Sequence, residues 1–399
     1  MQTLSTLIGS SSIFFALVFA LFAFIKSYRK KNKPLSFLSI FFVSISFYFV
    51  IQLFYLNDEI KILKILFPLV LPTFLLILPS FYIYIISISK SNFSTLKSTK
   101  HYLAPFLFLI FLIPFYFLND TEKLDFLRRN IDEIKDFKVI FIHYVFIIGV
   151  TAGIILQFVV YFVLFIRVLS RFDKKIENNF SSKDNLSINW AFTTIVLFLV
   201  LFLMLNFSEF LGVKTSIITK LFFNIVIISI LFYLYYNAVK LDFASIEKLK
   251  EQEKEKSTDN EPKESIEDFI NQIKYKTSTL NNLQKESLIK KIENLKENTS
   301  ELLDSELNIN SLAKKLETNT TYLSQIINEH YQTNFFQFVN QVRVEKAKQL
   351  LLNPSYEKYT IEALAELCGF KSRSSFYEAF KKRYGTTPLQ YKKNLSKAS

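Results

Sequence analysis

Seven long apolar runs constrain the fold of the first 240 residues of this 399-residue chain. Each run is long enough for a helix to cross the hydrocarbon layer of a membrane, which takes roughly 17–25 residues. The aromatic residues follow the same division, because 38 of the 45 Phe residues precede residue 244. A buried soluble core is the alternative, but so many runs in so short a chain favour a seven-helix transmembrane bundle over residues 1–243. The runs lie at about 6–25, 35–55, 65–89, 102–118, 139–166, 188–209 and 218–239.

The positive charges between the runs predict the orientation of the bundle. Loops after the odd-numbered runs carry more Lys and Arg than loops after the even-numbered runs, and cytoplasmic loops carry this excess. The first run lacks a basic leader, and basic residues follow it, which is the charge order of an uncleaved anchor. We therefore expect the N-terminus outside and everything after Lys240 in the cytoplasm. The basic residues after the first run are Lys26, Arg29, Lys30, Lys31 and Lys33.

Five polar side chains fall in the outer half of the predicted bundle. Polar residues inside a membrane are costly, so they are functional candidates by default. Together they predict a polar pocket that is open to the outside and receives a signal. Hydrogen bonding between helices, or snorkelling to the interface, is the alternative. The five residues are Gln52, His143, Asn206, Glu209 and Asn224.

The composition argues against several classes of function. Six Gly residues form neither GxGxxG nor GxxxxGK[ST], so no phosphate-binding loop is expected. A single cysteine, Cys368, allows no internal disulfide. His101, His143 and His330 are far apart in sequence, which disfavours a histidine-based metal site. With no acid pair or nucleophile–base set in place either, we expect no enzyme activity and no cofactor.

A charged segment follows the bundle. Residues 244–280 are rich in Lys and Glu with little to bury, so they predict a flexible linker. Over 281–300 the apolar residues Leu288, Ile292 and Leu295 recur at helical spacing, which predicts an amphipathic helix. That helix could pack on the next domain or pair with a second copy of the chain.

The tail contains the same helix-turn-helix pattern twice, over 308–329 and 360–382. Asn308 and Thr360 occupy the N-cap position of the two units, and Gly369 suits a left-handed helix end in the second turn. A helix over 335–352, about 27 Å long at 1.5 Å per residue, lies between the units. It could hold two recognition helices about one DNA turn, roughly 34 Å, apart. The matching apolar positions are Ile309, Leu312 and Ala313 in the first unit and Ile361, Leu364 and Ala365 in the second.

The tail resembles the AraC-type DNA-binding domain. LAKKL with TYLSQ, then NQVRVEKAKQLL, then IEALAELCGFKSRSSFYEAFKKRYGTTPLQYKK follow that family's signature in order and spacing over 301–394. Ile327 stands where the family often has Phe, and Gln332 where it often has Gly. The resemblance implies recognition helices over 320–329 and 373–382. The expected fold is thus all-α, a seven-helix bundle followed by a charged linker and a cytoplasmic double helix-turn-helix domain.

The resemblance also implies which side chains contact DNA. Gln can pair with adenine and Arg with guanine, while Lys and Arg neutralise phosphates. A solvated helix face is the alternative for each residue, and a structural hydrogen bond is the alternative for Arg343. The expected base contacts are Thr321, Ser324, Gln325, Arg373, Ser374, Ser375 and Tyr377, with Glu378 less clearly placed. The expected phosphate contacts are Arg343, Lys381, Lys382, Arg383, Lys392 and Lys393.

These features together predict a one-component transcription regulator in the inner membrane of a bacterium. The expected partners are double-stranded DNA, the lipid bilayer, a small or membrane-borne signal, a second copy of the chain and, for an activator, RNA polymerase. The alternative is a transporter or receptor whose basic tail binds a protein partner. Gln157, the clear polar residue near the midplane, is the feature that this alternative needs. Cys368 is expected in the core rather than as a redox sensor.

Overall fold

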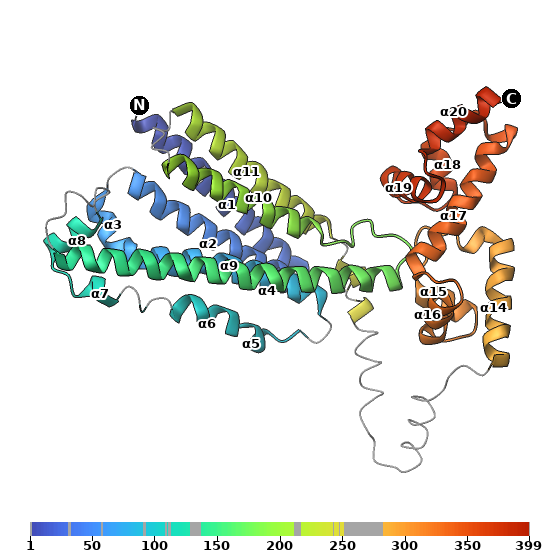
Figure 1. Ribbon diagram of the computed structural model, residues 1–399, viewed down its shortest axis with the longest axis horizontal. Coiled ribbons are helices and arrows are strands. Elements are labelled where there is room, and N and C mark those ends of the chain that lie inside the picture. The colour runs from blue at the N-terminus through green and yellow to red at the C-terminus, as the bar shows by residue number, and fades with distance from the viewer. Residues whose placement is uncertain are drawn as a thin grey trace, which may run out of the picture. The chain divides into compact units, whose positions relative to one another are not determined.

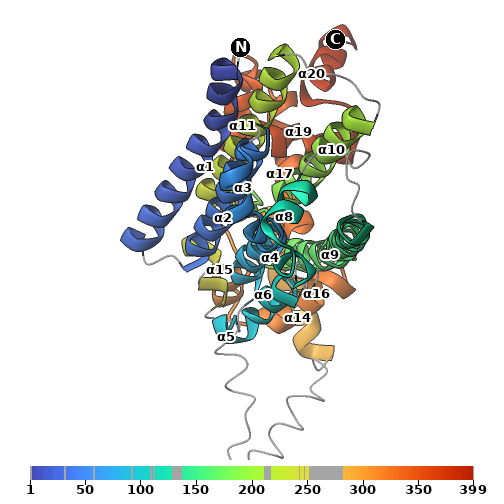
Figure 2. The same ribbon diagram turned by 90° about the vertical axis from the view of Figure 1, so that its left-hand side faces the viewer.

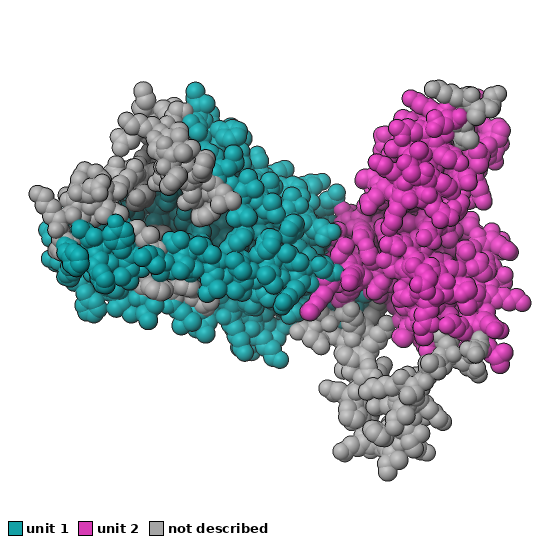
Figure 3. Space-filling model, viewed as in Figure 1, with its two compact units in different colours: residues 1–170, 188–254 teal, residues 171–187, 255–399 magenta. Residues whose placement is uncertain are grey.

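The computed structural model describes residues 2–30, 33–56, 59–90, 93–107, 110, 113–127, 137–210, 217–241, 243–246, 248–250 and 282–398. These residues form helices and the loops between them, without a strand among them, in agreement with the expected all-α class (Figure 1). They divide into two compact units, shown in two colours in Figure 3. Unit 1 comprises residues 1–170 and 188–254, and unit 2 comprises 171–187 and 255–399.

Unit 1 is a bundle of apolar helices. Helix α1 packs against α2 and α11, and α2 packs against α4, as Figure 2 shows from one side. The described helices are α1 (Gln2–Lys30), α2 (Lys33–Leu56), α3 (Ile60–Leu66), η1 (Phe67–Leu69), α4 (Val70–Ser89), α5 (Thr95–Ser98), α6 (Lys100–Leu107), α7 (Ile113–Tyr116), α8 (Asp120–Leu127), α9 (Phe137–Asn179, which continues into unit 2), α10 (Trp190–Phe210) and α11 (Ile217–Lys240).

Five described segments are long and apolar enough to cross a membrane. The fourth predicted run contains the described helices α6 and α7, and residues 108, 109, 111 and 112 between them lie outside the described residues. The sixth run is helix α10, Trp190–Phe210, and most of its side chains after Leu201 lie outside the described residues. Seven spans therefore remain a prediction. The five segments are Gly9–Arg29, Lys33–Phe54, Lys61–Ser89, Phe137–Asn179 and Leu221–Lys240.

The sequence predicts that the bundle ends at residue 243, but residues after 243 also pack in unit 1. Ile246 and Leu249 are buried in unit 1, and the Lys250 ammonium donates to the Ser87 carbonyl. The described chain of unit 1 is thus packed as far as Lys250. Most of the predicted linker, residues 251–280, lies outside the described residues.

A hydrogen bond between α4 and α9 compensates for a proline inside α4. Pro79 has no N–H, so the carbonyl of Leu75, four residues earlier, loses its usual partner in the helix. The side-chain amide of Gln157 donates to this carbonyl at 2.7 Å, and Gln157 is buried. Neighbouring side chains satisfy freed backbone groups in this way inside apolar bundles. Gln157 therefore has a structural partner.

We expect the Gln157→Leu substitution to lower the free energy of unfolding of unit 1 by about 1–3 kcal/mol, the cost of an unpaired buried polar group. In a Pro79→Ala background the N–H of residue 79 can bond to Leu75, so the same substitution should cost less. Thermal unfolding in detergent measures both losses. Gln52→Leu, on half-buried Gln52 of α2, is the control for added hydrophobicity. Equal losses with and without Pro79 would contradict this assignment.

Unit 2 contains the C-terminal helices and two apolar cores. The first core joins α14 to α15, α16 and the N-terminal half of α17, and the second joins the other half of α17 to α18, α19 and α20. The helices are α14 (Asn282–Glu297), η4 (Thr299–Glu301), α15 (Ile309–Lys315), α16 (Thr320–Glu329), α17 (Phe335–Leu352), η5 (Pro354–Tyr356), α18 (Ile361–Leu367), α19 (Arg373–Tyr384) and α20 (Pro388–Ala398).

Helix α14 lies where the sequence predicts an amphipathic helix. Leu288 and Ile292 are buried in the first core, and Leu295 packs against its edge. Glu293 of α14 also accepts a hydrogen bond of 2.7 Å from the hydroxyl of Tyr331. In this structure the apolar face of α14 packs on its own domain, the first of the two uses that the sequence left open.

Short polar side chains begin the helices of unit 2. The Asn308 side chain accepts from the amides of Asn310 and Ser311, both at 3.1 Å, and the Thr360 hydroxyl accepts from the Ala363 amide at 3.1 Å. Both predicted N-caps are thus confirmed. A capping side chain satisfies backbone donors that have no partner inside the helix.

Two turns place residues in the left-handed region of φ. Gly369, with φ +82°, ends α18, and a Cβ there would lie 2.1 Å from the Leu303 carbonyl oxygen. Glycine is therefore required at position 369, because of the positive φ and because a Cβ would collide with the Leu303 carbonyl. Gln332 has φ +52°, at a position where the AraC-type family often has Gly. Its side-chain amide donates to the Glu329 carbonyl at 2.7 Å, which offsets part of the strain.

We expect Gln332→Gly to stabilise unit 2 by about 0.5–1 kcal/mol, because glycine adopts positive φ without a steric cost. Hydrogen exchange of the α16 and α17 amides in the full chain measures this gain as slower opening. The control Gln349→Gly, on the exposed side of α17, should destabilise by about 1 kcal/mol. Faster exchange in Gln332→Gly would show that the side-chain bond outweighs the strain.

Candidate nucleic-acid interface

The second helix of each helix-turn-helix unit carries the predicted base-reading residues. In α16, Thr321 is exposed, and Ser324 and Gln325 are partly exposed. The Gln325 amide donates to the Glu329 carboxylate at 2.9 Å, one turn further along the helix. In α19, Arg373 and Ser374 are exposed. These faces have the polar character that base edges require.

Arg373 is held at the start of α19 by weak contacts. Its guanidinium lies 2.7 Å from the Glu362 carboxylate and donates to the Tyr377 hydroxyl at 3.2 Å. It also lies over the Tyr377 ring, 4.8 Å from the centroid. Because 62% of the Arg373 side chain is exposed, this ion pair contributes little and can be exchanged for a nucleobase.

Ser375 has a local role in the structure. Its hydroxyl donates to the Ser372 carbonyl at 2.9 Å, and its amide donates to the Ser372 hydroxyl at 3.2 Å. Ser372 thus caps α19, and the Ser375 hydroxyl is bonded back to the Ser372 carbonyl. A base contact from the Ser375 hydroxyl would have to replace this bond.

The predicted phosphate contacts fall into two groups. Lys381, Lys382 and Lys393 are exposed. Arg383 is paired with Glu345 of α17 at 3.0 Å, and Lys392 donates to the carbonyl oxygens of Glu357 and Tyr359. Burial favours protonation of Glu345, but hydrogen bonds from Tyr384 and Arg383 outweigh it and keep its pKa low. Glu345 therefore stays charged and fixes the end of α19 to α17.

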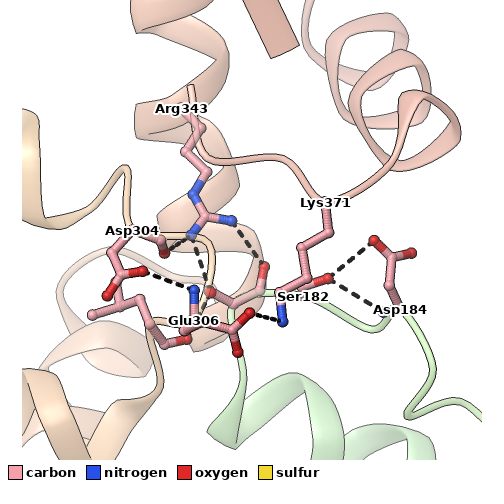
Figure 4. A network of polar contacts seen from close by, with 8 residues as sticks. Ser182, Asp184, Asp304, Glu306, Arg343 and Lys371 are labelled. Atoms are coloured by element: carbon pink, nitrogen blue, oxygen red, sulfur yellow. Dashed lines mark hydrogen bonds and ion pairs between the residues drawn. The ribbon is translucent and has the colours of Figure 1, made fainter. Parts of the chain in front are cut away.

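Arg343 differs from the predicted phosphate contacts, because its side chain is buried, 1% exposed. Its guanidinium donates to the Asp304 carbonyl at 2.7 Å (Figure 4). It also donates to the Leu302 carbonyl at 2.9 Å and to the carbonyl and hydroxyl of Ser181 at 3.3 and 3.1 Å. Burial lowers its pKa to about 10, so it remains charged at neutral pH. For Arg343 the structure therefore shows structural hydrogen bonds, which were the alternative to a phosphate contact. Phosphates cannot reach this guanidinium here.

Comparison with known proteins agrees with this arrangement. Residues 312–394 match a family model described as a helix-turn-helix domain. The Msm operon regulatory protein of Streptococcus mutans is 31% identical over 91 residues, 23% of this chain and 32% of that protein. The melibiose operon regulatory protein of Escherichia coli K12 is 32% identical over 94 residues, 24% of this chain and 30% of that protein. No solved structure matches the chain.

Residues 312–394 form an AraC-type helix-turn-helix domain. A third relative, the HTH-type transcriptional activator CfaD of Escherichia coli, is 41% identical over 63 residues, 16% of this chain and 23% of that protein. The chain spans about a third or less of the length of these relatives. By their names these relatives are regulators and not enzymes. The sequence predicts the same class, a regulator.

Cys368 belongs to the second core of the AraC-type domain. Its side chain is fully buried, in the same core as Phe370 and Phe376. Burial raises the pKa of the thiol to about 12, so the reactive thiolate is not formed at neutral pH. The structure agrees with a packing role for this residue.

The residues of the predicted signal pocket contact different helices of unit 1. Asn224 of α11 accepts hydrogen bonds from Ser11 and Ser12 of α1. The ring of His143 in α9 packs against Phe126 of α8, with ring centroids 5.0 Å apart. Gln52 lies half-buried in α2. The side chains of Asn206 and Glu209 in α10 lie outside the described residues, so a shared pocket remains a prediction.

One set of contacts to the AraC-type domain is not predicted by the sequence. Residues 171–187, between the fifth and sixth apolar runs, belong to unit 2, and Ser181 supplies two of the oxygens around Arg343. The stretch SSKDNLS reads as an ordinary polar loop. Only the three-dimensional structure brings it to the domain.

We expect Arg373→Ala to weaken binding to a cognate DNA site by about 1–3 kcal/mol while sparing nonspecific DNA, because Arg373 is assigned to a base. Lys382→Ala should instead weaken binding to all sequences and reduce the slope of log K against log salt by about 1. Binding titrations of the full chain at several salt concentrations separate the two effects. An equal loss on random DNA for Arg373→Ala would refute base reading by this residue.

Proposed function

We propose that this protein is a membrane-bound one-component transcription regulator of the bacterial inner membrane. The observation that carries the proposal is that one chain combines five segments able to span a membrane with an AraC-type domain. Large apolar side chains such as Phe14, Phe22 and Ile155 are exposed on α1 and α9, which suits contact with lipid. The AraC-type domain would bind double-stranded DNA by its two recognition helices, α16 and α19.

The assignment of residues 171–187 supports an orientation with the N-terminus outside. This segment is part of the same unit as the AraC-type domain, which supports a location of both on one side of the proposed membrane. DNA is cytoplasmic, and the loop after the fifth run would then be cytoplasmic as well. The excess of Lys and Arg in the loops after odd-numbered runs predicts the same side.

A signal would act by favouring one of two shapes of the bundle. A ligand shifts such an equilibrium only if its affinity for the two shapes differs. The ligand would be a small or membrane-borne molecule, received by the polar residues of the outer half. A second copy of the chain and, for an activator, RNA polymerase are further proposed partners. The transporter alternative has less support, because Gln157 is paired with the Leu75 carbonyl.

Selection of genomic fragments by the full chain in lipid nanodiscs, with excess nonspecific competitor DNA, tests the proposal. We expect one shared motif with two half-sites about one helical turn, roughly 10 base pairs, apart, because one domain carries two recognition helices. Recovery of unrelated fragments in proportion to their abundance would overturn the proposed function.

A further inference from the structure

The loop between α9 and α10 is docked on the AraC-type domain within unit 2. We call residues 180–187 the docked segment. Phe180 forms an isolated antiparallel bridge with Asn308, and the amide and hydroxyl of Ser181 donate to the Leu307 carbonyl at 3.2 and 2.6 Å. Ser181 is 2% exposed. The segment thus starts as a strand-like addition to the domain rather than as a free loop.

The docked segment completes the surroundings of a buried charge. Two of the four hydrogen bonds of Arg343 go to Ser181, and the others go to Leu302 and Asp304. Withdrawing Ser181 would leave guanidinium donors unpaired unless water replaced it. The docked state is therefore favoured when no ligand competes for the domain.

The residues on both sides of Ser181 add further contacts. Glu177, in the last turns of α9, accepts from the Asn334 side chain, the N-cap of α17, at 3.1 Å. Lys183 pairs with Glu177 at 2.6 Å and with Asp173 at 3.3 Å, and its ammonium lies 5.2 Å from the centre of the Phe336 ring. These bonds anchor the segment from the α9 side.

Asp184 extends the docked segment to the recognition helix. Its carboxylate accepts a hydrogen bond of 3.2 Å from the hydroxyl of Ser372, the N-cap of α19. A second bond of 3.2 Å from the Ser182 hydroxyl holds the carboxylate there. Arg373 and Ser374, the assigned base-reading residues, directly follow Ser372.

A carboxylate at this place conflicts with bound DNA. The N-terminal residues of a recognition helix enter the major groove, and helix N-termini contact DNA phosphates. Asp184 brings its negative charge to the end of α19 that approaches DNA, where it would repel phosphates and occupy the Ser372 hydroxyl.

We propose that the docked segment is an autoinhibitory contact, which excludes DNA from the N-terminus of α19 until Asp184 is withdrawn. This inference rests on the proposed function. Helix α9 ends at Asn179, immediately before the docked segment, so a change in α9 is the route by which a signal would release the domain.

The first test compares Asp184→Asn with Glu286→Gln in the full chain in nanodiscs. The Asp184→Asn side chain keeps an oxygen for the Ser372 hydroxyl but loses the charge, so DNA affinity should rise about two- to fivefold, the effect of one charge at a helix N-terminus. Glu286→Gln removes the same charge from an exposed position on α14, apart from the residues that hold the docked segment. We expect no gain there. Equal gains in both variants, or none in Asp184→Asn, would overturn the autoinhibition.

The second test follows hydrogen exchange of residues 176–187 in the unmodified chain, with and without a selected DNA fragment. DNA should accelerate exchange of the Ser181 amide, which is bonded to Leu307 in the docked state. Unchanged or slower exchange on specific DNA would show that segment and DNA bind together, against the inference. Loss of sequence preference in the unmodified chain and in both variants would instead overturn the proposed function and the inference with it.

Discussion

The buried guanidinium of Arg343 is the interaction on which the arrangement of the AraC-type domain depends. A buried charge is tolerated only when its donors are paired, so each segment that supplies an oxygen is held in place. Those segments are the stretch before the first helix-turn-helix unit and the docked segment. The guanidinium also lies 6.0 Å from the centre of the Phe370 ring, next to the Gly369 turn of the second unit. Arg343, one side chain of α17, thus fixes both helix-turn-helix units to the helix that lies between them.

A buried polar side chain with a paired donor also holds unit 1 together, but there the side chain is the neutral amide of Gln157. Pro79 frees the Leu75 carbonyl inside an apolar bundle, and Gln157 pairs with it. In both units a polar side chain from a long helix satisfies backbone oxygens that local structure leaves open. Such bonds select one packing among many that apolar contact alone would allow, because a helix that slides or rotates leaves the polar group unpaired.

The parts of the structure that the sequence predicts are local ones. N-caps at Asn308 and Thr360 and the left-handed Gly369 follow from side chains that act within a few residues of themselves. The bond of Arg343 to Ser181 joins residues 162 apart, and no local pattern marks it. Apolar runs predict where spans can lie, and five described segments have the length and composition of a span. The sequence alone does not decide the role of Arg343, because an arginine suits both a phosphate contact and a buried set of hydrogen bonds.

The docked segment offers a route by which a change in the bundle could reach the AraC-type domain. The charged composition after Lys250 predicts a flexible linker, and such a linker would transmit a displacement poorly. A continuous helix transmits it well, and α9 runs from unit 1 into unit 2 as far as Asn179. It leads directly to Ser181 and Asp184, which contact the Arg343 site and the start of α19. A small movement of α9 would therefore act on the junction of the two helix-turn-helix units and on the recognition helix at once, whereas the linker after α11 would only keep the domain near the membrane.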